Sequence, residues 1–463
     1  MTLVNSLLLG VTLALVAYAL GYLLLLKHAP EPAMAISLLL APYWTLAGAI
    51  PVLLAKRSQP LAEYSYLEHR LFPIFVDGTY ASTLLIYSVF VLGGLGVISV
   101  LTRGMTTAGQ RLSNSEWAVL SRRFGHVFLL VGTGVGLIVR LGLFVYLVRT
   151  SSSSSLYEAT RIVRGGNARF IQMYQYLTFM VAYPLAAGSA LWLAFPEARR
   201  AYRRRTRGLM WAAYSSMLLA LLAENAILGN RAVPLVMMGA VTAGWFRWRY
   251  LPASRTTRRP LRRRFVTVAA LGFLVLGTIG ISRGGALDSP SAVARSLSSN
   301  ITHVGNVFLQ STRSSEKLAA HMSLYGVLEQ PRLHLDALST NSYQDYGRLV
   351  GAPPDQVFTV HYVAAWWLRL GAWGLLAAIL TFAVVVAALQ RIATGRPTLR
   401  SAGFRLAAST LPAAGVPVIL LRSGPESIRA VVVELLFIPG IVLWSCFALG
   451  GRREVERGVE HQA

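Results

Sequence analysis

The chain has 463 residues, of which 54% are hydrophobic and only 14% are charged, and its mean hydropathy is +0.52. A soluble domain carries about 25% charged residues, so this composition excludes an ordinary water-soluble fold and indicates an integral membrane protein. The formal net charge of +25 lies mostly in short loops between apolar segments. We therefore interpret the basic residues as topology signals and contacts to anionic lipids, and not as a surface for nucleic acid. The single cysteine, Cys446, excludes an internal disulfide and a cysteine metal cluster.

Apolar segments long enough to cross a bilayer contain about 20 residues, and the chain has about eleven of them. We expect the first to be retained as a transmembrane helix, because no basic region precedes it and no small-residue cleavage site follows it. The predicted fold class is all-α, a polytopic integral membrane protein with one membrane domain over residues 1–463. The predicted transmembrane helices lie near 3–26, 34–55, 78–102, 124–148, 171–195, 209–228, 232–250, 265–282, 370–390, 404–421 and 429–450.

Arginine-rich loops determine the predicted orientation. Short basic loops beside transmembrane helices stay in the cytoplasm, and the loops 103–123, 196–208, 246–264 and 391–403 and the tail after 450 are all basic. They fall on one side of the predicted membrane, which places the N-terminus outside and the C-terminus in the cytoplasm. The longest loop, 283–369, is then outside, and its apolar spacing predicts short helices on the membrane surface, with an interfacial helix over Val357 to Leu368.

Arginine also occurs beside glycine on the predicted outer side, where basic residues are not expected. Arg164 and Arg169 flank Gly165 and Gly166 in the loop 149–170. Glycines allow close backbone approach and arginine donates bidentate hydrogen bonds to phosphate, so this loop could bind an anion. An interfacial loop held to lipid phosphates is the alternative.

Two further outer turns have the same composition. Gly229, Asn230 and Arg231 join two predicted transmembrane helices, and Arg422 precedes the turn from Ser423 to Ser427. A tight turn at membrane depth is tolerated where it lines a cavity or packs within protein. Arg231 then points into that cavity, or else it extends to the interface as a lipid-facing arginine.

Two charged residues fall inside predicted transmembrane helices near the outer leaflet. Arg140 lies within 124–148 and Glu224 within 209–228. Arginine at the centre of a membrane helix costs about 2.5–3.5 kcal/mol on insertion scales, so it requires a polar partner or cavity. We predict an ion pair between Arg140 and Glu224, which is either part of a functional site or purely structural.

The long outer loop supplies candidate bases. Asp345, His321, His334 and His361 are the titratable side chains considered, although single residues of this kind in a long loop more often serve as surface or capping groups. Metal-binding spacings such as HExxH and CxxC do not occur, so no metal is predicted. A P-loop and a nucleophile elbow are also missing, which argues against ATP hydrolysis and serine hydrolysis.

The chain resembles the Wzy-like O-antigen and exopolysaccharide repeat-unit polymerases of bacteria. The resembling features are the Gly-Asn-Arg turn at 229–231, the single long outer loop late in the chain, and the segment SYQDYGRLVGAPP leading to HYVAAWWLRLGAWGLLAAIL. The turn RSGPES before the last predicted helix is similar to the arginine–glycine turn of that family. An acidic motif that could be assigned as catalytic was not found.

The resemblance implies a metal-independent glycosyltransferase without cofactor in the bacterial inner membrane. Its substrate would be an undecaprenyl pyrophosphate-linked oligosaccharide, transferred onto another lipid-linked unit at the periplasmic face. Membrane lipids and a chain-length regulator protein are the other implied partners, and nucleic acid is not. The predicted catalytic residues are Arg231, Glu224, Asp345 and His321, of which the last three are alternatives for the base. The residues predicted to bind pyrophosphate or substrate are Arg164, Arg169, Arg422, Arg140, Arg283 and Tyr346.

Three other functions stay open at this point. An O-antigen ligase would share the topology and the donor but would use a lipid A core as acceptor. A flippase or another transporter would be expected to show inverted repeats, which this sequence lacks. A structural membrane subunit would leave the buried arginine and the three outer arginine turns without an explanation.

Overall fold

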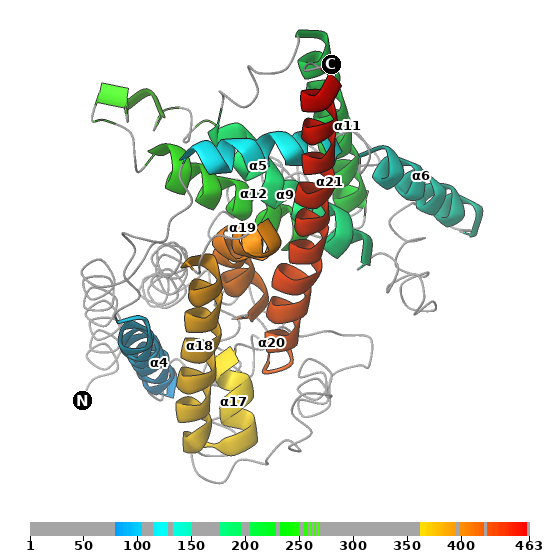
Figure 1. Cartoon of the computed structure of the whole chain (residues 1–463). Coiled ribbons are helices and arrows are strands. Elements are labelled where there is room, and N and C mark those ends of the chain that lie inside the picture. Colours follow the sequence, from blue (N-terminus) through cyan, green and yellow to red (C-terminus); the bar gives the residue numbers. More distant parts are fainter. Residues whose placement is uncertain are drawn as a thin grey trace. The chain divides into compact units, whose positions relative to one another are not determined.

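The computed structural model describes residues 79–103, 114–127, 133–150, 176–195, 204–227, 232–250, 362–394, 399–420 and 424–460, with scattered positions between 254 and 267. Within these ranges every regular element is a helix (Figure 1). The predicted helices at 3–26, 34–55 and 265–282, and most of the loop 283–369, lie outside the described residues.

The described helices follow the apolar segments. The α-helices are α4 (Thr79–Thr102), α5 (Asn114–Val127), α6 (Thr133–Thr150), α9 (Tyr183–Ala194), α11 (Arg204–Ile227), α12 (Ala232–Trp245), α17 (Tyr362–Leu370), α18 (Ala372–Thr394), α19 (Leu399–Gly415), α20 (Ser427–Arg429) and α21 (Ile438–Glu460). Wider π-helical segments are η2 (Thr178–Ala182), η3 (Phe246–Tyr250), η5 (Val416–Leu420) and η6 (Ala430–Phe437). Two helices in the described part of the chain, Ala372–Thr394 and Ser427–Leu449, are long and apolar enough to cross a membrane.

One prediction about the helices was wrong. Helix α5 occupies residues that were predicted to form part of the loop 103–123. Leu120 and Phe124 are four residues apart, so they lie on one face of the helix, and both are buried. Phe124 lies against Gly188 of α9. Arg122 and Arg123 lower the mean hydropathy of this segment, which explains why an apolar-run criterion missed a helix that packs on one face.

The described residues fall into two compact units. The first unit contains α4, α17, most of α18 and the turn before α20. Its core is aromatic, because the rings of Phe90 and Phe382 lie 5.3 Å apart and Phe90 also contacts Tyr362. Gly94 of α4 lies against the ring of Phe382, so the absence of a side chain lets α4 approach α18 closely.

Gly371 determines how α17 connects to α18 within this unit. Its φ of +59° is a left-handed conformation that glycine adopts without steric cost. Its N–H donates to the carbonyl oxygen of Trp367 at 2.7 Å, which terminates α17. A side chain at Gly374 would collide with the backbone of Trp366. The two glycines thus allow a nine-residue helix to fold back closely against the start of α18.

The second unit is a bundle in which α12 contacts α9 and α19, and α21 contacts α5 and α19. Small residues mark its closest contacts: Gly244 of α12 lies against Ala190 of α9, and Gly403 of α19 lies against the backbone of Gly440 in α21. Close backbone approach through glycine and alanine is typical of helices packed in a membrane, where dispersion contacts replace the hydrophobic effect.

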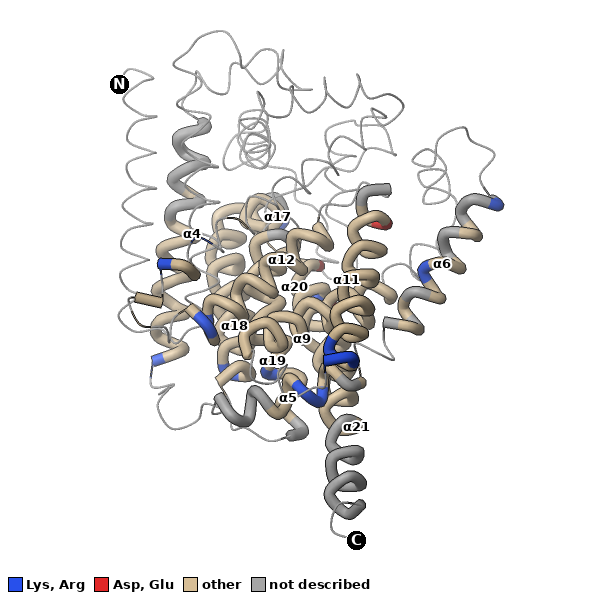
Figure 2. Tube along the Cα trace, turned by 90° about the horizontal axis from the view of Figure 1, so that it is seen from above, with Lys and Arg blue, Asp and Glu red and all other residues tan. Residues whose placement is uncertain are grey.

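Charges are distributed asymmetrically along α11 of the second unit. Its first turn carries arginines, and its only acidic residue, Glu224, lies in the last turn (Figure 2). The neighbouring segment α12–η3 has arginines at its C-terminal end, Arg247 and Arg249. In each of these two helical segments, the basic end is therefore the end that is farther along the chain from the connection 228–231.

Candidate functional site: buried arginine–carboxylate pairs

Three arginines in the described part of the chain are buried: Arg140, Arg369 and Arg405, with exposed fractions of 7%, 1% and 3%. A guanidinium withdrawn from water needs hydrogen-bond acceptors or an opposite charge to offset its desolvation. The partners of these three side chains therefore indicate where the fold has been built around a charge.

Arg140 of α6 forms an ion pair with Glu224 of α11. The predicted pair is thus present in the structure. Arg140 lies seven residues after Thr133 and ten before Thr150, which corresponds to about 10 Å and about 15 Å from the two ends of α6. The side chain of Arg140 is 6% exposed and that of Glu224 is 20% exposed, so the pair is more accessible from the carboxylate side.

The approach of α6 to α11 explains why these two side chains meet. A side chain at Gly136 would lie 2.8 Å from the terminal methyl of Met217, so the two helices are in close contact there. Arg140 is one turn after Gly136, and Glu224 is two turns after Met217, so both charged residues lie on the faces that make this contact. The length of the arginine side chain spans the remaining offset between the helices.

Asn225 adds a second buried polar group at the same end of α11. It is 1% exposed, and its Nδ2 donates to the carbonyl oxygen of Leu221 at 2.7 Å. Helix α11 ends at Ile227 and α12 begins at Ala232. The polar residues Glu224 and Asn225 therefore lie within one turn of the connection 228–231.

Most predicted site residues lie outside the described part of the chain. The structure places two of them, Arg140 and Glu224, and brings them together. The remaining members of the predicted set have no described position, and their roles stay predictions: Arg231, Arg164, Arg169, Arg283, His321, Asp345, Tyr346 and Arg422.

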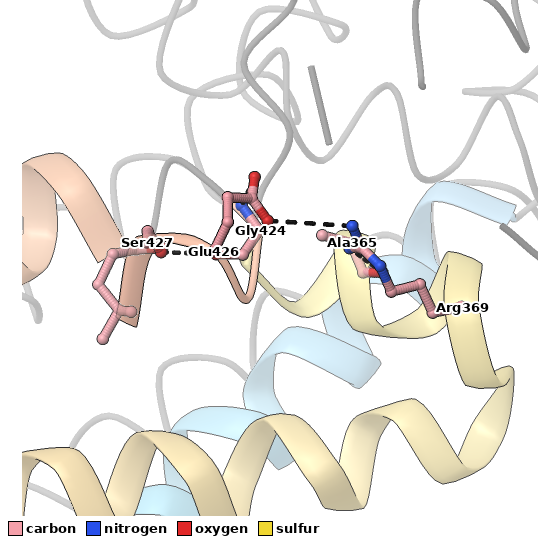
Figure 3. A network of polar contacts seen from close by, with 6 residues as sticks. Ala365, Arg369, Gly424, Glu426 and Ser427 are labelled. Carbon is pink, nitrogen blue, oxygen red and sulfur yellow. Dashed lines mark hydrogen bonds and ion pairs between the residues drawn. The ribbon is translucent and has the colours of Figure 1, made fainter. Parts of the chain in front are cut away.

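A second arginine–carboxylate pair was not predicted from the sequence. Arg369 of α17 directs its guanidinium toward Glu426, which lies in the turn before α20, and Nη2 is 3.9 Å from Oε2 (Figure 3). Nη1 also donates to the carbonyl oxygen of Ala365 at 3.3 Å. Arginine within an apolar segment after two tryptophans, WWLRL, was a signal that could have identified it, but its partner is distant in the sequence.

The turn that carries Glu426 is held by its own backbone. Ser427 N–H donates to the carbonyl oxygen of Gly424 at 3.0 Å, and the Ser427 hydroxyl donates to the same oxygen at 2.6 Å. Gly424 N–H donates to Glu426 Oε1 at 3.1 Å. One carboxylate oxygen is thereby fixed to the turn, while the other faces Arg369.

Arg405 has a different environment. Its Nε donates to the carbonyl oxygen of Ala393 at 3.4 Å, at the last turn of α18, which ends at Thr394. A cation beside the C-terminal carbonyls of a helix is favourable, because these groups carry partial negative charge. We interpret Arg405 as a structural cap of α18 and not as part of a functional site.

Comparison with known proteins gave no match: no protein-family model, no curated protein and no solved structure matches this chain. Among the described residues, no group of three or more His, Cys, Asp or Glu side chains is arranged to hold a metal ion. The described structure therefore defines a helical protein with two helices able to cross a membrane, and it contains the arginine–carboxylate pairs Arg140–Glu224 and Arg369–Glu426.

Proposed function

We propose that this protein polymerises lipid-linked oligosaccharide repeat units at the periplasmic face of the bacterial inner membrane, using an undecaprenyl pyrophosphate-linked donor. The observation that carries the proposal is the buried pair of Arg140 and Glu224, one turn before the connection that contains Gly229, Asn230 and Arg231. This connection is also one of the features that carry the resemblance to the Wzy-like polymerases.

The proposed topology has about eleven transmembrane helices, each of about 20 residues. The distribution of charge supports it: the basic ends of α11 and of α12–η3 would be cytoplasmic, and the connection 228–231 would face the periplasm. Loop 283–369 would be periplasmic, and α17 would lie at the membrane interface, with its tryptophans at headgroup level.

The chemistry of such a transfer suits arginine. The acceptor hydroxyl oxygen forms a bond to the anomeric carbon of the donor sugar, the bond from that carbon to the pyrophosphate oxygen breaks, and the lipid pyrophosphate leaves. Preorganised arginines stabilise the negative charge that develops on this leaving group. We assign this role to Arg164, Arg169, Arg231 and Arg422, with Arg140, Arg283 and Tyr346 in support.

The proton of the acceptor hydroxyl must pass to a base. Glu224 is engaged by Arg140, and an ion-paired carboxylate near the end of a helix is better suited to position neighbouring groups than to accept a proton. We therefore propose Glu224 as a positioning residue, which leaves Asp345 and His321 as the candidates for the base.

The test is a deletion of the gene in its own host, complemented with wild type or with Arg231→Ala, followed by separation of the surface glycan by size on a gel. We expect the deletion to leave single repeat units in place of a ladder, and only wild type to restore the ladder. Membrane extracts must contain equal amounts of both proteins, so that loss of activity is separated from loss of folding.

The same experiment separates the alternatives. A ladder that persists on lipid carrier but is not joined to a lipid A core would indicate a ligase. Lipid-linked units that accumulate inside the cell without surface glycan of any length would indicate a flippase. Either result would replace the polymerase proposal.

A further inference from the structure

The carboxylate of Glu426 is oriented more firmly than a surface acid normally is. Its Oε1 accepts a hydrogen bond from Gly424 N–H at 3.1 Å, and its Oε2 lies 3.9 Å from Nη2 of Arg369. That separation is longer than a hydrogen bond, so Arg369 acts on the carboxylate as a nearby charge. A carboxylate has about four acceptor positions, so a carboxylate oriented in this way can accept a hydrogen bond from a ligand hydroxyl beside its protein contacts.

The two partners differ in access to solvent. The side chain of Arg369 is 1% exposed, whereas that of Glu426 is 19% exposed. The accessible surface of the pair therefore belongs to the carboxylate, and Figure 3 shows the guanidinium directed toward it. An anionic ligand such as pyrophosphate would meet the carboxylate first and be repelled. A cationic ligand would be opposed by the charge of Arg369, so a neutral ligand rich in hydroxyl groups fits best.

Aromatic side chains of α17 lie in the same unit. The ring of Trp366 contacts that of Tyr362 edge-on, with centroids 6.3 Å apart, and Trp366 is half-buried. Trp366 and Arg369 are three residues apart and lie on one side of α17. The hydroxyl of Tyr362 is hydrogen-bonded to Thr381 of α18 at 2.7 Å, which holds α17 on α18. An indole ring has an apolar face and an N–H group at its edge. The face can pack against the C–H groups of a sugar ring, and the N–H group can bind a sugar hydroxyl.

We infer that the turn from Gly424 to Ser427 and helix α17 bind the acceptor glycan, with Glu426 accepting hydrogen bonds from its hydroxyl groups and Arg369 as a positioning residue. The inference rests on the proposed function and extends it, because it assigns the acceptor sugar to a site of its own. The pyrophosphate of the donor is assigned to other residues, of which Arg422 immediately precedes this turn in sequence.

The experiment uses the full-length protein purified in detergent, with lipid-linked repeat units from the host as donor. The acceptor probe is the repeat-unit oligosaccharide released from the host's own surface glycan, which carries no phosphate. Glu426→Gln should raise the KM for this acceptor about 10- to 100-fold, as expected for the loss of a hydrogen bond to a charged group. The KM for the donor should stay within about twofold, because the donor is bound by other residues.

Three further variants complete the design. Glu426→Asp keeps the charge and should recover part of the acceptor affinity. Arg369→Lys keeps the charge near Glu426 but loses the hydrogen bond from Nη1 to the carbonyl oxygen of Ala365, so it should give an intermediate acceptor KM. Glu454→Gln is the matched control, since it makes the same substitution in the basic tail after the last predicted transmembrane helix, and it should behave as wild type.

The outcomes decide separately on the two proposals. An acceptor KM unchanged by Glu426→Gln, or an equal rise in both KM values, would overturn the acceptor site, because a merely structural pair would affect donor and acceptor alike. Lack of product from wild type would count against the polymerase function. In that case binding of the same oligosaccharide is measured by quenching of tryptophan fluorescence. Binding to wild type that is lost in Glu426→Gln would support the sugar site. No binding to wild type would overturn it.

Discussion

The pair formed by Arg140 and Glu224 can be tested by a double-mutant cycle that separates stability from function. Glu224→Leu leaves a guanidinium that is 6% exposed without its carboxylate. Removing one member of a buried ion pair costs about 3–5 kcal/mol, because the other charge stays desolvated. Arg140→Met alone leaves a carboxylate that is 20% exposed and can be hydrated, so its cost should be smaller.

The double variant Arg140→Met/Glu224→Leu removes both charges. Replacement of a buried ion pair by apolar residues of similar volume is neutral or stabilising by about 1–4 kcal/mol. We therefore expect the double variant to be at least as stable as wild type, with a strongly non-additive cycle. Unfolding is followed by intrinsic tryptophan fluorescence in detergent against increasing denaturant. Arg149→Met, an exposed position on the same helix, is the control and should change stability by less than about 0.5 kcal/mol.

Activity then distinguishes the two interpretations of the pair. If Arg140 and Glu224 position the connection that contains Arg231, the double variant should fold but fail to restore the glycan ladder in the deletion strain. A ladder of wild-type length from this variant would refute the reasoning. The pair would then be structural, and both residues would leave the proposed site.

Three other predictions follow from the charges and the packing. Arg231→Lys should restore little of the ladder, because lysine keeps the charge but not the bidentate geometry; wild-type glycan lengths would argue against bidentate binding. Polymerisation by the purified protein should persist in excess EDTA, and a strict need for a divalent cation would contradict the use of arginine at the leaving group. Gly403→Ala should lower the denaturation midpoint, because the new methyl would meet the backbone of Gly440 and Trp444, whereas Gly208→Ala, which meets nothing within 4 Å, should be neutral or stabilise α11 by up to about 1 kcal/mol. Equal midpoints for the two alanine variants would contradict this account of the packing.

Apolar runs predicted the positions of several helices closely, because polar residues bound them at both ends. The segment predicted at 78–102 contains α4, and the segment at 232–250 is α12 with η3. Helix α5 was not predicted, because Arg122 and Arg123 lie within it and interrupt the apolar run. A helix that buries one face needs apolar residues at a spacing of three to four and not a continuous run.

The two ion pairs show the same limit for the candidate site. Arg140 and Glu224 could be matched from the sequence because few charges occur inside apolar segments, so each had few possible partners. Arg369 and Glu426 could not be matched, because Glu426 lies in a polar turn, where a charged residue is common and does not indicate a buried partner. Their contact depends on the way α17 folds back at Gly371, and a sequence pattern does not contain that geometry.

Each pair involves a carboxylate that is close in sequence to an arginine of a predicted outer turn. Glu224 precedes Arg231 by seven residues, and Glu426 follows Arg422 by four. The structure pairs Glu224 with Arg140 and Glu426 with Arg369, each an arginine from another helix. Under the proposed function, a carboxylate held by one arginine attracts a second arginine less strongly. Removing Arg140 should therefore increase the attraction of Glu224 for Arg231 and weaken the stabilisation of the leaving pyrophosphate, which a shorter glycan ladder from Arg140→Met would show.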